Sequence, residues 1–199
     1  RYENYDTSGT TIISGNTVAY TRAYDDVIAS LGLNYEVTEE LRLVGGFYEG
    51  FRAPTIDDLV SVKTTQQNTI TTPGNFGINP EHSYTYEVGF KYNYDRWRVQ
   101  MYEWWTDFTN YIGRQTLTNT AGANVEFLVN QQAHLQGTEL YAEYLINESW
   151  SVWGNGAHTY GKIANGQPFP RLPPIQGWLG LKWRDTELPR YFEVYTWMV

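Results

Sequence analysis

Apolar and polar side chains alternate with a period of two along several segments of the chain. Between Tyr84 and Asn93, four aromatic residues and Val88 occupy every second position, and polar residues or glycine lie between them. A β-strand directs successive side chains to opposite faces, so this period indicates a strand with one apolar and one polar face. Similar patterns predict strands at Val27–Val37, Leu41–Arg52, Ser83–Asn93, Trp97–Phe108, Gln136–Ile146, Trp150–Tyr160, Gly177–Trp183 and Tyr191–Val199, with a short additional strand at Arg1–Asp6.

The connections between these segments alternate in length. Short polar turns are expected at Thr38–Glu40, Tyr94–Arg96, Asn147–Ser149 and Asp185–Pro189. Long loops are expected at Ala53–His82, Thr109–Ala133 and Gly161–Pro174, and Val125–Val129 can form a hairpin arm within the second of these. A soluble sandwich has no reason to keep every long loop at one end, whereas an outer-membrane barrel has short periplasmic turns and long extracellular loops. The pattern therefore predicts an all-β fold, a segment of an antiparallel transmembrane β-barrel, with a soluble antiparallel sheet as the alternative.

In this interpretation the apolar face of each strand contacts lipid and the polar face lines a watery interior. One strand departs from the rule, because Glu103 falls on the face that carries Trp97, Val99, Met101 and Trp105. A charge on the lipid face is costly near the midplane and cheap near the interface. Either Glu103 lies at the outer rim, or a bulge between Met101 and Trp104 shifts the face.

Composition narrows the choice of function. The chain has 199 residues, 17% aromatic residues, no cysteine and a formal net charge of −8. The negative charge argues against nucleic acid as a partner, and the lack of cysteine excludes disulfides and cysteine–metal chemistry. No run of about 18 apolar residues is present, so no helical membrane span is expected. The mean hydropathy of −0.51 suits strands in which half the positions are polar.

Several segments, in order, resemble the C-terminal part of TonB-dependent outer-membrane receptors. The segment Tyr48–Leu59 contains Gly-Phe-Arg-Ala-Pro followed by Asp-Asp-Leu, and Gly77–Ser83 is similar to the Asn-Pro-containing loop that enters a descending strand in that family, with Pro80 alone of the two usual prolines. Further similarities lie at Gln136–Leu140, Arg171–Pro174 and Arg1–Asp6. Each motif is weak alone, and their order and spacing make the combination specific.

The resemblance implies uptake of a scarce solute, such as a siderophore, cobalamin, glycan or metal chelate, across the cell outer membrane with TonB-coupled energy. It implies as partners the outer-membrane lipid, the receptor's own plug domain, the TonB complex, a small-molecule substrate and neighbouring outer-membrane proteins. Such barrels have about 22 strands, so residues 1–199 are expected to be a partial barrel domain, without the plug and the final strands. The alternative function is a structural or adhesive component of an outer-membrane assembly that does not transport.

Candidate site residues are few. Arg52 falls on the polar face, where it is either a partner for interior carboxylates or a contact for an anionic ligand. His82, His134 and His158 share no metal-ligand spacing, and the adjacent pairs Asp25–Asp26 and Asp57–Asp58 lack a calcium-loop pattern, so no metal site is expected. Glu139 and Glu143 share the polar face, as interior carboxylates of transporters do.

No nucleophile, phosphate-loop or metalloprotease motif appears, so we expect neither an enzyme nor a cofactor. The polar stretches Val62–Gly77 and Tyr111–Gln132 are expected to be exposed outer loops that help to capture the substrate.

Overall fold

The computed structural model describes residues 1–13, 16–60, 70–71, 77–118 and 124–199, and the chain divides into two compact units. Unit 1 comprises Arg1–Ala29, Glu49–Tyr84 and Asp107–Ala133, and unit 2 comprises Ser30–Tyr48, Thr85–Thr106 and His134–Val199. Among the described residues, no helix has the length and apolar character needed to cross a membrane.

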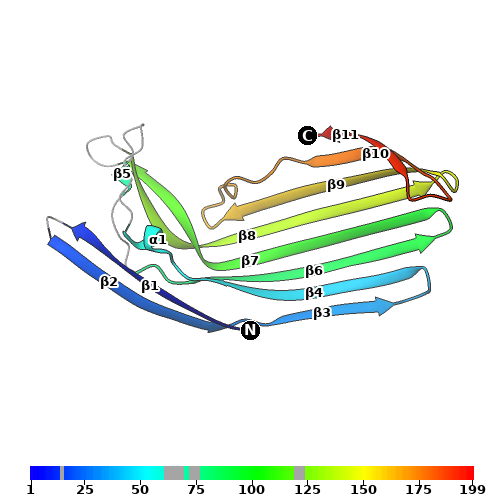
Figure 1. The fold of residues 1–199 in the computed structure, drawn as a ribbon. Helices are drawn as coiled ribbons and strands as arrows, with labels where there is room; N and C mark the ends of the chain where they lie inside the picture. The colour runs from blue at the N-terminus through cyan, green and yellow to red at the C-terminus, as the bar shows by residue number, and fades with distance from the viewer. Residues whose placement is uncertain (14–15, 61–69, 72–76, 119–123) are drawn as a thin grey trace. The chain divides into compact units, whose positions relative to one another are not determined.

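The main sheet has the neighbour order β11-β10-β9-β8-β7-β6-β4-β3, which follows the chain (Figure 1). Its strands are β3 (Ser30–Glu36), β4 (Leu41–Arg52), β6 (Glu81–Tyr94), β7 (Trp97–Thr118), β8 (Asn124–Leu145), β9 (Trp150–Ile163), β10 (Gln176–Arg184) and β11 (Tyr191–Met198). All eight strands correspond to predicted segments, so the all-β sheet is confirmed. In unit 2 the four short turns that join β3 to β4, β6 to β7, β8 to β9 and β10 to β11 lie at the same end of the strands (Figure 1).

Strand register in unit 2 agrees with the predicted faces. On β3 and β4, Leu31 lies opposite Phe47, and Tyr35 lies opposite Leu43. On the other face Glu36 lies opposite Arg42, and their side chains form an ion pair of 3.2 Å. A slip of one residue would exchange the two faces, so the apolar alternation fixes the register.

The same separation of faces continues across the sheet. Leu181 of β10 pairs with Val152 of β9 on one side and with Val194 of β11 on the other. The next residue, Lys182, pairs with Ser151 and Glu193 on the opposite face. We call the face of Leu31, Phe47, Leu181 and their neighbours the apolar face, and the other the polar face.

Glu103 lies on the apolar face without a bulge. The rings of Trp97 and Tyr144 are 4.8 Å apart at one end of this stretch, and those of Trp105 and Tyr86 are 6.1 Å apart at the other end. Between them, Thr138 donates a hydrogen bond to the Glu103 carboxylate. Because the alternation is unbroken from Trp97 to Trp105, the expected alternative of a bulge between Met101 and Trp104 is wrong.

Unit 1 contains a hairpin of β1 (Tyr2–Ile13) and β2 (Asn16–Val27), together with α1 (Ile56–Val60) and β5 (Ile70–Thr71), which pairs with β8. The expected short strand Arg1–Asp6 is therefore wrong in length. The expected single strand Val27–Val37 is also wrong, because β2 ends at Val27 and β3 begins at Ser30. The Ala29 amide donates to the Glu49 carboxylate (2.9 Å) instead of to a neighbouring strand, which explains the break.

The expected loop Thr109–Ala133 is wrong, because β7 continues to Thr118 and β8 begins at Asn124. Backbone pairing extends the hairpin where the side chains no longer alternate between apolar and polar, and the arm Val125–Val129 is part of β8. The loop Ala53–His82 contains α1 and the first residues of β6, and its segments 61–69 and 72–76 lie outside the described residues. The loop expected at Gly161–Pro174 begins three residues later than predicted, because β9 continues to Ile163.

Burial differs sharply between the units. In unit 1, Leu59, Ile78 and Ile112 form a buried cluster, with Leu59 and Ile78 fully enclosed. The apolar face of unit 2 is open, with exposed fractions of 71% for Leu31 and 66% for Leu33. Hydrophobic side chains of a water-soluble sheet would pack into a core, so this face needs another apolar phase or partner to cover it.

Candidate functional site

Arg52 ends β4 in unit 1 and lies among carboxylates. Its Nη2 is 2.9 Å from Asp58 Oδ2, and its Nη1 is 3.8 Å from Glu81 Oε2. Pro54 lacks a backbone donor and stops the strand, so the chain turns into α1 and brings Asp58 back to the guanidinium. The two carboxylates balance the positive charge of Arg52, which favours its interpretation as a partner for interior acids. Contact with an anionic ligand stays a prediction.

Asp58 also closes the N-terminus of α1. Its carboxylate accepts hydrogen bonds from the Thr55 amide and the Thr55 hydroxyl, both at 2.9 Å, while the Asp58 amide donates to Thr55 Oγ1 at 3.3 Å. These reciprocal bonds form a capping box, which satisfies backbone donors at the start of a helix. The sequence Thr55–Asp58 carried this signal, although no helix was predicted there.

The Asn-Pro motif before β6 is held by side chains from the long hairpin. Asn130 of β8 accepts a bond from the Asn79 amide at 2.7 Å, and its Nδ2 donates to the carbonyl oxygens of Asn79 and Asn110 at 3.0 and 2.7 Å. Glu81 accepts a bond from the Ile112 amide at 2.9 Å. The motif segments Phe51–Leu59 and Gly77–Ser83 therefore meet in one region of unit 1, which we call the clasp.

The β1–β2 hairpin contacts the clasp through one face. Asp26 Oδ2 lies 3.1 Å from His82 Nδ1, and the Tyr5 ring lies 5.9 Å from the Phe51 ring. The Thr7 hydroxyl donates to the Pro54 carbonyl oxygen at 3.2 Å. These contacts position the hairpin through a histidine, an aromatic ring and a proline carbonyl that all belong to the predicted motifs.

Tyr24 is a buried residue of this hairpin, with 5% of its surface exposed. Burial, and then the hydrogen bond of 3.0 Å between its hydroxyl and that of Tyr20, raise its pKa to about 12. The guanidinium of Arg22 lies 5.1 Å from the centre of the Tyr24 ring and opposes the shift in part. Tyr24 consequently stays neutral across the physiological pH range.

The polar face of unit 2 carries a second polar network. Glu143 is 7% exposed, and its carboxylate accepts bonds from Arg98 Nη1 at 2.9 Å, Ser151 Oγ at 2.9 Å and Tyr141 OH at 3.2 Å. A buried carboxylate is tolerated when donors replace the lost water, and three donors do so here. The indole of Trp153 lies between Tyr141 and Tyr195 on the same face, with ring distances of 6.5 and 6.3 Å.

The remaining candidate residues are dispersed. Asp25 and Asp26 are successive residues of β2 and therefore point to opposite faces of the hairpin. His134 lies 3.5 Å from the Gln136 side chain, and His158 is exposed. Within the described ranges, no group of three or more histidine, aspartate or glutamate side chains is placed to hold a metal ion. Glu139 shares the polar face with Glu143 as predicted, and the side chain of Asp57 lies outside the described set.

Sequence reasoning missed Asn130, and it considered Asp26 only as half of an acidic pair and not as the partner of His82. Both are polar residues in segments without apolar alternation, and their partners are distant in sequence. The sequence motif marked only their partners, because Asn79 and His82 both belong to the segment Gly77–Ser83.

A family model described as "TonB dependent receptor-like, beta-barrel" matches residues 1–198. Comparison of the sequence with curated proteins gives no match. The fold is similar to the copper transporter OprC, with 20% identity, a TM-score of 0.70, and coverage of 89% of this chain and 28% of that one. It is also similar to the ferric yersiniabactin uptake receptor FyuA from Yersinia pestis, with 19% identity, a TM-score of 0.61, and coverage of 94% and 28%.

A third similar structure is the Serratia marcescens hemophore receptor HasR, in a complex with its hemophore HasA and heme. Its identity is 15% and its TM-score 0.67, with coverage of 94% of this chain and 37% of that one. The chain thus spans 28% to 37% of the length of these three proteins. At these identities the likeness concerns the fold.

Proposed function

Because the chain belongs to the family of TonB-dependent receptor-like β-barrels, we propose that the protein carrying it is an outer-membrane receptor that takes up a scarce solute with energy supplied through TonB. In this proposal residues 1–199 form part of the barrel wall. The plug domain and the TonB contact belong to other parts of the receptor. The chain itself performs no chemical catalysis.

The observation that carries the proposal is the exposed apolar face of unit 2. Leu31, Leu33, Val88 and Leu179 are all at least half exposed on strands whose backbone groups pair with neighbours. In hydrocarbon every backbone polar group must be satisfied within the protein, and a sheet with an apolar outer face meets this condition where its strands have neighbours on both sides, as β4 and β6 to β10 do. Aromatic residues near the turn end, among them Tyr35, Trp97 and Trp183, suit the membrane interface.

The polar face then forms the wall of the lumen. The buried carboxylate of Glu143 is satisfied locally by its contacts with Arg98, Tyr141 and Ser151. A wall with satisfied charges is a rigid surface against which a plug domain can rest, and it is not a reactive centre. The clasp in unit 1 likewise joins loop segments through paired charges.

The solute belongs to the class that the similar proteins suggest by their names: copper, ferric yersiniabactin and heme are handled by OprC, FyuA and HasR. We propose a siderophore, cobalamin, glycan or metal chelate as the substrate. The stretch Val62–Gly77 and the outer part of the β7–β8 hairpin are the parts of this chain that we expect to meet it first, because binding residues concentrate on segments held by a rigid scaffold.

Topology can be tested with single cysteines, since the chain has none of its own. Glu39→Cys lies in a short turn and Gln167→Cys lies in a long connection, and both side chains are exposed. A membrane-impermeant maleimide added to intact cells should label Gln167→Cys alone, and Glu39→Cys should react after the outer membrane is permeabilised. Labelling of Glu39→Cys in intact cells would contradict the proposed orientation.

Transport is tested with the full-length receptor. Material that co-purifies with the receptor should contain a small solute, and its uptake by cells should require both the receptor and TonB. Uptake that persists without TonB, or a receptor that holds no solute and whose deletion leaves growth on scarce nutrients unchanged, would favour the structural or adhesive alternative.

A further inference from the structure

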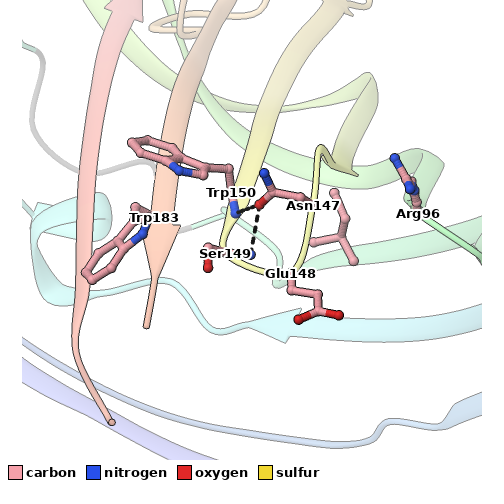
Figure 2. Close-up of a pocket in the computed structure, with 7 residues that line it drawn as sticks. Arg96, Asn147, Glu148, Ser149, Trp150 and Trp183 are labelled. Carbon is pink, nitrogen blue, oxygen red and sulfur yellow. Dashed lines mark hydrogen bonds between the residues drawn. The ribbon is translucent and has the colours of Figure 1, made fainter. Parts of the chain in front are cut away.

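A cavity of about 710 Å³ opens at the turn end of the strands in unit 2. The residues around it belong to the β6–β7 turn, to the β8–β9 turn with the strand ends beside it, and to the end of β10 (Figure 2): Arg96, Leu145, Asn147, Glu148, Ser149, Trp150 and Trp183. This volume falls in the range of about 300–1,000 Å³ that small-molecule sites occupy. None of these lining residues belongs to the clasp, and none takes part in the hydrogen bonds of Glu143.

The β8–β9 turn that borders the cavity is held by several hydrogen bonds. Asn147 Oδ1 accepts hydrogen bonds from the amides of Ser149 at 2.9 Å and Trp150 at 2.8 Å (Figure 2). The Ser149 carbonyl oxygen accepts a bond from the Arg184 amide at 2.7 Å. These bonds hold the turn in place beside the cavity.

Two charges of opposite sign border the cavity without a charged partner. Arg96 Nη1 donates to the Ile146 carbonyl oxygen at 3.1 Å, which anchors the guanidinium and leaves its other nitrogens without a bond to any described residue. The Glu148 carboxylate forms no ion pair with the described part of the chain, and it is exposed. An anchored cation and an exposed anion at one cavity complement a ligand that carries both charges.

Two indoles complete the site. Trp150 and Trp183 are register partners on adjacent strands, and they lie on the apolar face next to the turn (Figure 2). Indoles have an apolar body and one polar N–H, and they favour the boundary between hydrocarbon and head groups. Leu145 also borders the cavity, on the side of the sheet that carries Glu143.

We propose that this cavity binds the head group of a zwitterionic aminophospholipid, phosphatidylethanolamine, from the periplasmic leaflet. Arg96 binds the phosphate, Glu148 binds the ammonium group, and the two indoles cover the glycerol and the first acyl carbons. The inference rests on the proposed function, because that function places the short turns at the periplasmic surface. The required ligand chemistry is a phosphate and an ammonium group on one molecule, next to an apolar chain.

The test uses the full-length receptor reconstituted in vesicles of equal parts phosphatidylethanolamine and phosphatidylglycerol with identical acyl chains. After extraction in mild detergent, the retained lipids are counted by native mass spectrometry. Arg96→Gln should lower retention of both lipids by roughly tenfold, as expected for loss of a charge-assisted bond. Glu148→Gln should remove the preference for phosphatidylethanolamine and leave phosphatidylglycerol unchanged, because only the former carries an ammonium group.

Arg190→Gln and Glu187→Gln are the matched controls. They change the same charges on the β10–β11 turn and lie outside the cavity, so lipid retention should stay at the wild-type level. An equal loss of lipid retention in the controls would indicate a general effect of surface charge and would contradict the proposed site. Unchanged retention in both Arg96→Gln and Glu148→Gln would overturn it as well.

A further arm separates a lipid from a soluble ligand. Free phosphorylethanolamine should displace the lipid only weakly, because it lacks the acyl chains that contact the indoles. Displacement at equal concentrations would overturn the lipid assignment in favour of a soluble phosphate compound. The receptor could insert with Glu39 on the periplasmic side and import its solute, and yet show no lipid preference. This result would contradict the lipid site and leave the proposed function intact. A receptor with the reverse orientation would remove the proposed function too.

Discussion

Thr138 donates a hydrogen bond to Glu103 on the apolar face of the sheet, between the ring pairs Trp97–Tyr144 and Trp105–Tyr86. The bond gives the carboxylate a partner on a face that otherwise carries apolar side chains. Replacing Thr138 with valine removes the donor and leaves the charge in place. We expect Thr138→Val to lower the free energy of unfolding by about 1.5–3 kcal/mol, the usual contribution of a hydrogen bond to a charged group.

Glu103→Leu provides the control for this prediction. Without the carboxylate, Thr138→Val should cost close to nothing, so the double-mutant cycle should show coupling between the two positions. Urea unfolding of the full-length receptor in vesicles is the measurement. An equal effect of Thr138→Val in both backgrounds would show that the bond contributes nothing to stability.

The face assignment of β6 leads to a second prediction. Val88 is 50% exposed on the apolar face, and Val88→Arg should cost about 2–4 kcal/mol if the residue lies near the midplane. Glu87→Arg introduces the same side chain on the polar face and should cost much less. Gly89 is unsuitable as the control, because a Cβ there would lie 2.5 Å from the Met101 carbonyl oxygen. The two variants are compared by their unfolding midpoints in vesicles, and equal destabilisation would refute the register.

The clasp allows the two interpretations of Arg52 to be separated. If Arg52 pairs with carboxylates, Asp58→Asn and Arg52→Gln should both increase protease cleavage of the loops after β4, and the double variant should be no worse than either single one. If Arg52 contacts an anionic ligand, Arg52→Gln should weaken binding of the solute while Asp58→Asn preserves it. We expect the first result, because Arg52 Nη2 lies 2.9 Å from Asp58. Ligand affinity and cleavage rates, measured on the same preparations, decide between them.

Tyr24 makes the stability of the hairpin depend on pH. Its pKa is raised from 10.0 to about 12, so the unfolded chain loses this proton at a lower pH than the folded chain does. The resulting stabilisation is complete below pH 10 and is lost as the pH rises toward about 12. Wild-type receptor should lose more stability than Tyr24→Phe over this interval. Denaturant midpoints at the two ends of the interval test this, and parallel losses in both proteins would contradict it.

The sequence predicts unit 2 well and unit 1 poorly, for a physical reason. Where one face meets an apolar phase, alternation must be strict, and pairs such as Leu31–Phe47 can be anticipated from the sequence. In the β1–β2 hairpin, threonine, serine, glycine and aspartate give no such pattern. Its position depends on single contacts such as Asp26 with His82, whose partners are distant in sequence.

In the clasp, too, the sequence predicts the position of single residues but not their contacts. The sequence placed Arg52 on the polar face and identified Asp58 and Glu81 as parts of two motifs, but it could not show that both carboxylates approach one guanidinium. The role of Asn130 could not be predicted, because an isolated asparagine carries no periodic signal. The cavity beside Arg96 could not be predicted either, because three separate segments of the chain line it.

The last prediction concerns the isolated chain. Within the described residues, β3 and β11 end the sheet, so each has one edge with no strand beside it. These strands have 7 and 8 residues, and each open edge therefore presents several unpaired donors and acceptors. In hydrocarbon each such group costs several kcal/mol, which together exceeds the stability of about 5–15 kcal/mol of a typical domain.

Residues 1–199 expressed alone should therefore fail to form a heat-resistant monomeric barrel in detergent or vesicles. Electrophoresis of unheated and heated samples measures this, because a folded barrel migrates differently before heating. The full-length receptor, treated identically, is the control and should show the shift. A heat-modifiable monomer of the isolated chain would require β3 and β11 to pair with each other, and it would assign the chain to a small closed barrel instead of a larger wall.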